Sequence, residues 1–438
     1  MFYQNKLKYI NKAASIGCFI LLLFSACCKV IEQPPVTEVR TEDGVLTSKE
    51  FIWKKDVSEK GLIWGTVSPA IYENTVVVAG ATNQERDMLV ALNLDSGEEV
   101  WRWTDYFTIE HISAMSNSEY EFNQKDNIWL LQNSYNFYAI DLKTGTTLWK
   151  DKRNVGIGGI EGMQIIGNKY YTSFAFYKND SLTWPTLVEG DIYSTNYSKI
   201  LEAPIDSIQF FGFFYGNMDE PFMYEENGQL YAFLQFSENV DVYTSKIFNY
   251  VASYNLTNQS YDFEKTRLGD TATLGLGHRA VMYNDLMLVN ADQELYGINK
   301  YTGEVVWHLD QFDKNGDGVF TYAIYKDKLI AVNKIGVTSR VMALNPLTGQ
   351  IIWEDIGRGN AAESIHFLND VLYFSSRGDG HVYAYDTENG ELLWQLDSPE
   401  YESFQGYGGL RAIPGKNGEK GKIIASTYTS AFCYEAER

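Results

Sequence analysis

A short pattern recurs five times along this chain and restricts what it can fold into. Each copy has a small residue, Asp or Asn two positions later, Gly four positions after that, and Trp after a further four. The copies begin at Ala91, Ala139, Gly297, Ala343 and Ala384. Alternating apolar residues on both sides of the glycine predict two strands, each with one buried face. Asp or Asn can accept hydrogen bonds from the amides that follow it, and Gly adopts the positive φ of a tight turn. Each copy therefore predicts a β-hairpin.

Weaker copies of the hairpin occupy the gaps between these five. Residues 253–263 keep Asn255 and an aromatic Phe263 but have Gln259 at the glycine position, and residues 189–199 keep only Asp191. A last copy starts at Cys433, so that successive copies lie 48, 50, 64, 44, 46, 41 and 49 residues apart. Strand-rich units with a period of about 40–50 residues are typical of a radial or stacked array.

The last unit is divided between the two ends of the chain. It starts at Cys433, and residues 50–56 supply its missing strand, with Trp53 at the tryptophan position. An open solenoid has capping units at its ends, whereas a closed ring needs a borrowed strand to complete its final sheet. We therefore predict an all-β fold: an eight-bladed β-propeller of four-stranded antiparallel blades, whose last blade is closed by an N-terminal strand.

The repeat resembles the tryptophan-docking motif of the pyrroloquinoline-quinone (PQQ) propeller superfamily, and the resemblance covers residues 50–438. In type it is closest to the BamB-like outer-membrane assembly lipoproteins. The superfamily also contains quinone-dependent alcohol dehydrogenases, and the resemblance implies that the tryptophans dock blade on blade in both branches. The residues assigned to docking are Trp53, Trp101, Trp149, Trp307, Trp353 and Trp394.

Residues 1–26 have the features of a lipoprotein signal peptide. Three lysines lie within the first 12 residues, and the apolar run over residues 16–24 is too short to span a membrane. Cys27 lies where a bacterial lipobox places the acylated cysteine, although Phe24 replaces the usual Leu. We expect lipidation at Cys27 and an outer membrane lipoprotein that faces the periplasm. Ordinary secretion with cleavage near Ala26 is the alternative.

Residues 27–49 are expected to form a flexible tether between the lipid and the propeller of residues 50–438. They are polar, contain Pro34 and Pro35, and lack hydrophobic periodicity. The formal net charge of the chain is −21, which disfavours binding to nucleic acid or to anionic lipid. The membrane is therefore expected to be reached only through the lipid anchor.

Quinone catalysis is not expected. The dehydrogenase resemblance implies a vicinal disulfide, a bound metal ion, an Asp base and often a haem. The only adjacent cysteine pair, Cys27 and Cys28, lies at the lipidation position, and no Cys-x-x-Cys-His motif occurs. The histidines also lack the spacing of a zinc site. His278 with Arg279 is a candidate for the central channel, against the simpler interpretation of polar residues at a strand end. We expect no catalytic residue, no required cofactor and no bound PQQ.

Residues 313–321 resemble the first half of a calcium loop. Asp313, Asn315 and Asp317 stand at alternate positions before a glycine, as the oxygen ligands of such loops do. Val319 would add its carbonyl, and Thr321 its hydroxyl or a bound water. The Glu that completes an EF-hand is missing, so a polar connection between two blades remains the alternative.

The leading hypothesis for function is a non-catalytic, lipid-anchored envelope scaffold that binds envelope proteins through the loops between its blades. The alternatives are a PQQ-dependent dehydrogenase-like enzyme and a propeller that binds a sugar or another ligand. Tyr and Phe are abundant, but strands favour both residues in any case. The stretch of residues 153–248 departs most from the repeat, and Trp184, Phe211, Phe213 and Tyr215 are its candidates for ligand stacking.

The calcium hypothesis predicts a melting temperature that depends on the ion. A ligand bound only by the folded state contributes about 2.7 kcal/mol at a hundredfold excess over its Kd. Calcium should raise the melting temperature of the wild type but not that of Asp313→Ala/Asp317→Ala, and magnesium should have less effect because it demands octahedral geometry. Equal calcium responses in the two proteins would place the ion elsewhere.

Overall fold

In the computed structural model the chain divides into two units, Met1–Thr37 and Glu38–Arg438. The structure describes residues 38–59, 67–81, 87–105, 123–133, 136–152, 162–179, 182–205, 217–241, 246–269, 279–291, 294–310, 320–335, 338–357, 364–376, 379–399, 402–405, 409–416 and 418–438. Within these ranges the named elements are all strands. No helix there is long and apolar enough to cross a membrane.

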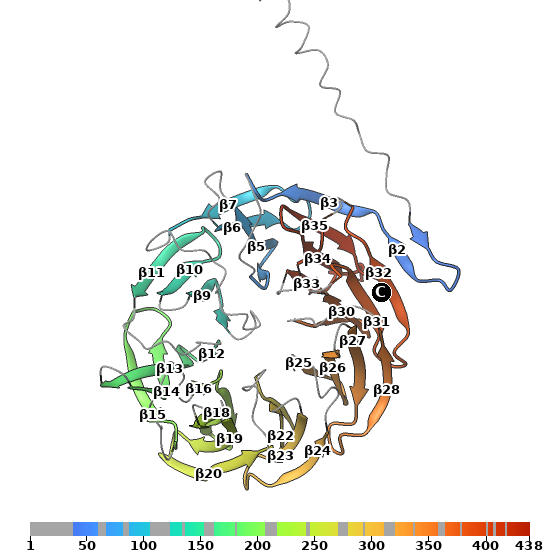
Figure 1. Cartoon of the computed structure of the whole chain (residues 1–438). Coiled ribbons are helices and arrows are strands. Elements are labelled where there is room, and N and C mark those ends of the chain that lie inside the picture. Colours follow the sequence, from blue (N-terminus) through green and yellow to red (C-terminus); the bar gives the residue numbers. More distant parts are fainter. Residues whose placement is uncertain are drawn as a thin grey trace, which may run out of the picture. The chain divides into compact units, whose positions relative to one another are not determined.

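The strands form eight sheets arranged around a ring, and within each blade they pair antiparallel, which confirms the predicted eight-bladed propeller (Figure 1). Blades 1 to 4 follow each other along the chain. Their strands are β4 (Ala70–Tyr72), β5 (Thr75–Ala81), β6 (Asp87–Asn93) and β7 (Glu99–Trp103); β8 (Gln124–Lys125), β9 (Ile128–Asn133), β10 (Asn136–Asp141) and β11 (Thr146–Lys152); β12 (Met163–Ile166), β13 (Lys169–Asn179), β14 (Leu182–Asp191) and β15 (Tyr197–Glu202); and β16 (Asn217–Met218), β17 (Phe222–Glu226), β18 (Gln229–Asp241), β19 (Lys246–Asn255) and β20 (Ser260–Leu268).

Blades 5 to 8 complete the ring. Their strands are β21 (Val281–Tyr283), β22 (Leu286–Ala291), β23 (Glu294–Asn299) and β24 (Val305–Leu309); β25 (Phe320–Tyr325), β26 (Lys328–Ile335), β27 (Thr338–Leu344) and β28 (Ile351–Ile356); β29 (His366–Leu368), β30 (Val371–Ser375), β31 (Val382–Asp386) and β32 (Leu392–Leu396); and β33 (Leu410–Ile413), β34 (Lys422–Ser426), β35 (Ser430–Glu435) and β3 (Phe51–Asp56). Where the first strand of a blade is labelled, as for β12, β16, β25 and β33, it lies nearest the centre of the ring (Figure 1).

The N-terminal strand β3 closes blade 8, as predicted. It pairs antiparallel with the C-terminal strand β35, with Trp53 opposite Cys433 and Asp56 opposite Ser430. Figure 1 places these two strands side by side although they lie at opposite ends of the sequence. The ring is therefore held shut by backbone hydrogen bonds between its first and last strands, and β35 does not present an open edge.

Five of the six docking tryptophans reach the turn of the next blade; the exception is Trp394, which donates to the Glu437 carboxylate. The indole Nε1 of Trp53 donates to the carbonyl of Leu94, 2.9 Å away, and a Cβ built on Gly97 would lie 2.7 Å from the indole. Gly97 has a φ of 70°, so the turn brings bare backbone against the ring. The equivalent indole bonds join Trp101 to Leu142, Trp149 to Ile192, Trp307 to Pro346 and Trp353 to Thr387.

The small residue of the repeat lies opposite the tryptophan of its own blade. Gly297 is paired with Trp307, and a Cβ on Gly297 would lie 2.2 Å from the indole nitrogen. A larger side chain at this position would push the indole out of its place against the next blade. The weak copy in blade 4 keeps the geometry: Ser253 is opposite Phe263, and Gln259 takes the glycine conformation with a φ of 56°.

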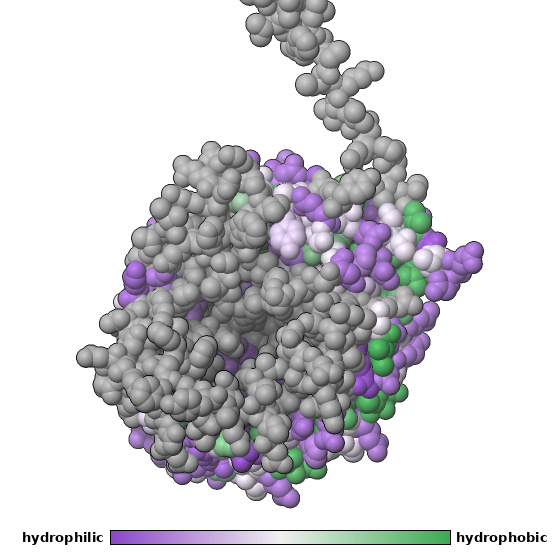
Figure 2. All heavy atoms as spheres, in the orientation of Figure 1, coloured by the Kyte–Doolittle hydropathy of each residue, from purple (hydrophilic) through white to green (hydrophobic). Residues whose placement is uncertain are grey.

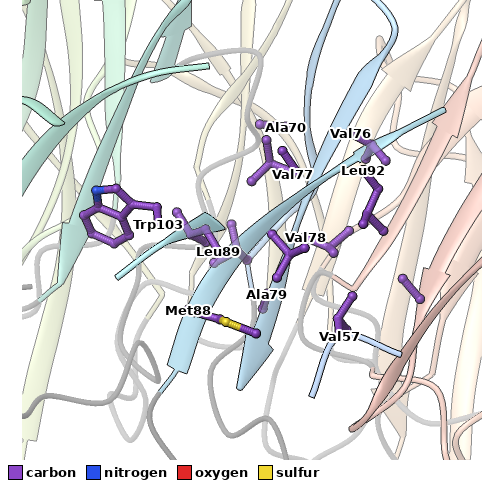
Figure 3. Close-up of a cluster of buried hydrophobic side chains, with 14 of the residues drawn as sticks. Val57, Ala70, Val76, Val77, Val78, Ala79, Met88, Leu89, Leu92 and Trp103 are labelled. Carbon is purple, nitrogen blue, oxygen red and sulfur yellow. The ribbon is translucent and has the colours of Figure 1, made fainter. Parts of the chain in front are cut away.

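The hydrophobic core consists of layers between adjacent blades. One cluster joins blades 8, 1 and 2, from Trp53 and Cys433 through the buried valines of β5 to Trp129 and Tyr138. Figure 3 shows part of this cluster, with Val77, Val78 and Leu89 on the two central strands of blade 1. Since every blade buries both faces against its neighbours, stability is shared around the ring.

Residues 38–49 differ from the expected tether, because β1 (Val39–Arg40) and β2 (Leu46–Ser48) extend the sheet of blade 7. Strand β2 runs parallel to β32, with Leu46 opposite Trp394. Leu46 is buried, and the Lys49 ammonium lies 4.5 Å from the centre of the Trp394 ring. A single leucine in a polar stretch produces no hydrophobic periodicity, so the contact of Leu46 with β32 could not be predicted from the sequence.

The docking contact predicts a specific cost for a methyl group at Gly97. Gly97 and Gly228 both have positive φ, but a Cβ on Gly228 has no heavy atom within 4 Å. Gly228→Ala should therefore cost about 1–2 kcal/mol from backbone strain alone. Gly97→Ala should cost about 1–3 kcal/mol more, because the methyl overlaps the Trp53 indole. Urea unfolding midpoints measure both, and equal losses would contradict the docking role of Gly97.

Candidate functional site

The innermost strands bring together polar side chains from several blades. Arg279 lies just before β21 in blade 5, Glu220 just before β17 in blade 4, and Gln164 on β12 in blade 3. The Arg279 guanidinium donates to Gln164 Oε1 at 3.1 Å and to Glu220 Oε1 at 3.4 Å. Gln164 also exchanges two hydrogen bonds with the Met223 backbone. One arginine thus connects three consecutive blades.

This buried ion pair has the character of a structural link. The side chains of Arg279 and Glu220 are only 11% and 6% exposed, so neither charge would be tolerated without the other. The guanidinium also lies over the ring of Phe222. Arg279, which the sequence suggested for the central channel, therefore binds side chains of neighbouring blades of the same chain.

A second inner cluster joins blades 7 and 8. Arg411 on β33 donates from Nη1 to Nδ1 of His366 on β29, 3.3 Å away. Burial lowers the pKa of His366 to about 4, although a backbone hydrogen bond at Leu410 opposes the shift. At neutral pH the imidazole is therefore uncharged, and its Nδ1 accepts a hydrogen bond from the Arg411 guanidinium.

A belt of polar residues lies on the second strand of the sheet in seven blades. Each member is less than 5% exposed: Gln132, Ser173, Gln235, Asn290, Asn333, Ser375 and Ser426. Two of the serines donate a hydrogen bond from their hydroxyl to a backbone carbonyl of the next blade. Ser173 donates to Met218 and Ser375 donates to Gln405, both at 2.6 Å. The belt is recognisable in the sequence only once the strands are aligned, and its contacts give it a role in joining blades.

The outer rim of the ring exposes aliphatic side chains. The residue before the docking tryptophan is about half exposed in five blades: Ile52, Val100, Leu148, Val306 and Ile352. Hydrophobic residues are visible along the side of the rim where β2, β28 and β24 lie (Figure 2). Blade 7 differs, because β2 lies against β32 and the equivalent Leu393 is partly buried.

Comparison with known families identifies the relatives of this ring. The family described as outer membrane protein assembly factor BamB matches residues 38–162 and 271–373, which together are more than half of the chain. The chain belongs to this family. The resemblance to the PQQ-like propeller superfamily is thereby confirmed. A search of curated proteins finds none that matches the sequence.

Solved structures share the fold of this BamB-family chain at low sequence identity. A computationally designed protein, Ika8, has a TM-score of 0.56 and 12% identity, and the match covers 87% of this chain and 99% of that one. Quinohemoprotein alcohol dehydrogenase ADHIIG from Pseudomonas putida HK5 has a TM-score of 0.56 and 11% identity, with 87% and 76% covered. BamB from Moraxella catarrhalis has 0.49 and 15%, with 80% and 98% covered. At such identities the likeness establishes the fold alone.

Most of the predicted site residues lie outside the described part of the chain. These are Cys27, His278, Phe211, Phe213 and Tyr215, together with the calcium-loop residues Asp313, Asn315, Asp317 and Val319. Thr321 is fully buried on β25, opposite Val332. Trp184 donates from Nε1 to the carbonyl of Ala203 and packs within the core of blades 3 and 4. Calcium binding and Cys27 lipidation stay predictions.

The low pKa of His366 predicts a loss of stability in acid. The unfolded state binds a proton near pH 6.5, whereas the folded state binds it only near pH 4, so stability is complete above pH 6.5 and falls between these values. By pH 5 the free energy of unfolding should have fallen by about 2 kcal/mol through protonation of His366 in the unfolded state.

Denaturant unfolding at pH 7 and pH 5 measures this loss in the wild type and in His366→Gln. The variant should lose about 2 kcal/mol less between the two values. His381→Gln is the control for replacing a histidine elsewhere in blade 7, because His381 is partly exposed and lies outside the buried pair of His366 and Arg411. Parallel pH profiles for wild type and His366→Gln would contradict the neutral buried imidazole.

Proposed function

We propose that this protein is a non-catalytic, lipid-anchored propeller of the bacterial envelope that acts as a scaffold for other envelope proteins. Membership of a family described as an outer membrane protein assembly factor supports this role. The signal sequence and the cysteine at position 27 support an outer membrane anchor and a periplasmic ring. Outer membrane protein assembly is the process in which the scaffold would act.

The scaffold role is assigned to the surfaces that the packing of the blades leaves exposed. Each blade buries both faces against its neighbours, so that the surfaces left for partners are the loops between strands and the outer rim. Blade-connecting loops remain part of the proposal, and the rim is the part of this surface that the structure describes best.

The observation that carries the proposal is the pairing of β2 with the outer edge strand of blade 7, β32. This extended segment adds to the outer edge of β32, buries Leu46 and partly covers Leu393. Blade 6 offers the same edge uncovered among the described residues, with Ile351, Ile352 and Ile356 exposed on β28. An extended segment of a partner protein would add to β28 as β2 adds to β32, gaining backbone hydrogen bonds and apolar contact.

The enzyme alternative is less well supported by the channel-side residues. Arg279 is paired with Glu220, and His366 accepts a hydrogen bond from Arg411. The propeller sequence also lacks the adjacent cysteine pair that the dehydrogenase resemblance implies. Addition of PQQ and calcium to the purified protein should therefore give neither a quinone absorbance shift nor dye-linked alcohol oxidation. Either response would favour the enzyme.

Photo-crosslinking in intact envelopes tests the scaffold proposal. A photoreactive residue at position 352 or 356 should crosslink to one extended segment of an outer membrane assembly protein. The matched control is Tyr193, which is equally exposed but lies in a hairpin turn of blade 3. Ile352→Lys should abolish the crosslink from position 356 without changing the melting temperature. Equal crosslinking from positions 193 and 356, or none from the rim, would overturn the rim as the partner site.

The anchor is tested separately at the cysteine pair. Cys27→Ser should abolish labelling by a fatty-acid probe and leave an unprocessed or soluble protein, because the acylated thiol is lost. Cys28→Ser is the control and should be labelled as the wild type is. Labelling that persists in Cys27→Ser and disappears in Cys28→Ser would move the anchor by one residue.

A further inference from the structure

A hairpin in blade 5 brings three metal-binding side chains together on the protein surface. Glu294 begins β23, His308 lies on β24, and Asp310 follows the end of β24. One ligand atom from each of these residues lies within 4.8 Å of the other two. The register pairs Tyr296 with His308 and Leu295 with Leu309, so that Glu294 and Asp310 come next to each other on the same face.

Tyr296 holds two of the three ligands in place. Its hydroxyl donates to Glu294 Oε2 at 2.5 Å, and its ring stacks on the His308 imidazole with centroids 6.0 Å apart and an angle of 24°. Tyr296 is itself only 5% exposed and packs in the core between blades 4 and 5. The orientation of the carboxylate and the imidazole is therefore fixed by a buried residue before any ion arrives.

We propose that Glu294, His308 and Asp310 bind a divalent transition metal ion of the zinc class. An imidazole nitrogen with two carboxylate oxygens is a ligand set of zinc sites, whereas calcium takes oxygen ligands. His308 Nε2 already lies 2.9 Å from Asp310 Oδ1, and an ion would replace the proton that this contact shares. His308 and Asp310 are exposed, which leaves coordination positions for water or for a ligand from a partner.

The proposed site uses other residues than the predicted calcium loop, whose residues Asp313 to Val319 lie outside the described part of the chain. Asp310 precedes Asp313 by three residues in the sequence, but the zinc ligands come from the hairpin and include an imidazole. The two sites therefore differ both in ligand chemistry and in the residues that would abolish them. Sequence spacing alone did not indicate the zinc site, because Glu294 is 14 residues from His308.

Zinc titration by calorimetry and cobalt absorption spectra test the proposal. The protein used for both measurements is the mature chain with the substitution Cys28→Ser, so that the thiol of residue 28 does not bind the metal. One zinc ion should bind per chain, and cobalt should give the visible absorption of a site with a nitrogen ligand. His308→Ala and Glu294→Gln should each weaken zinc at least tenfold.

Two controls separate this site from its neighbours. His381 forms a similar pair with Asp397 at 2.7 Å but is not part of a three-ligand group among the described residues, so His381→Ala should leave zinc affinity unchanged. Asp313→Ala/Asp317→Ala should also leave it unchanged. Zinc binding that survives His308→Ala, or that is absent from the wild type at micromolar concentrations, would overturn the proposal, and loss of zinc in the loop variant would assign the ion to the loop.

Discussion

The packing of an indole on the turn of the next blade is the contact on which this ring depends. Each turn needs an Asp or Asn whose side chain accepts hydrogen bonds from the turn amides. It also needs a residue of positive φ, which brings bare backbone against the indole of the previous blade. The strand before the turn needs a small residue opposite the tryptophan of its own blade. In blade 1, Asn93 Oδ1 accepts from the amides of Asp95 and Ser96, and Gly97 lies against Trp53. Four sequence positions thus serve one joint, which explains why they recur together.

Closure follows from repeating this joint around a circle. Trp53 belongs to the strand that completes blade 8, and its indole binds the turn of blade 1, so one residue takes part in both the last sheet and the first interface. The joint between blades 7 and 8 departs from the rule. There, Trp394 Nε1 donates to the side-chain carboxylate of Glu437 and not to a backbone carbonyl of the turn.

The sequence was sufficient for the blades because each hairpin is a local structure. The spacing of Asp or Asn, Gly and Trp predicted the eight blades and the closing strand, and even Gln259 adopts the conformation of the glycine it replaces. Contacts between distant residues were not predicted. The contact of Leu46 with β32, the pair of His366 and Arg411, and the cluster of Glu294, His308 and Asp310 all depend on a register that only the folded chain defines.

Chemical labelling of Cys433 tests the closed ring most directly. Cys433 is fully buried opposite Trp53, and burial raises the pKa of its thiol to about 12. In a chain that starts at residue 29 it is the only cysteine. Closure predicts that alkylation occurs only on unfolding, and that it becomes rapid under native conditions when residues 50–57 are deleted or Trp53 is replaced by Ala. Equal protection of Cys433 in the intact and the shortened chain would contradict the account.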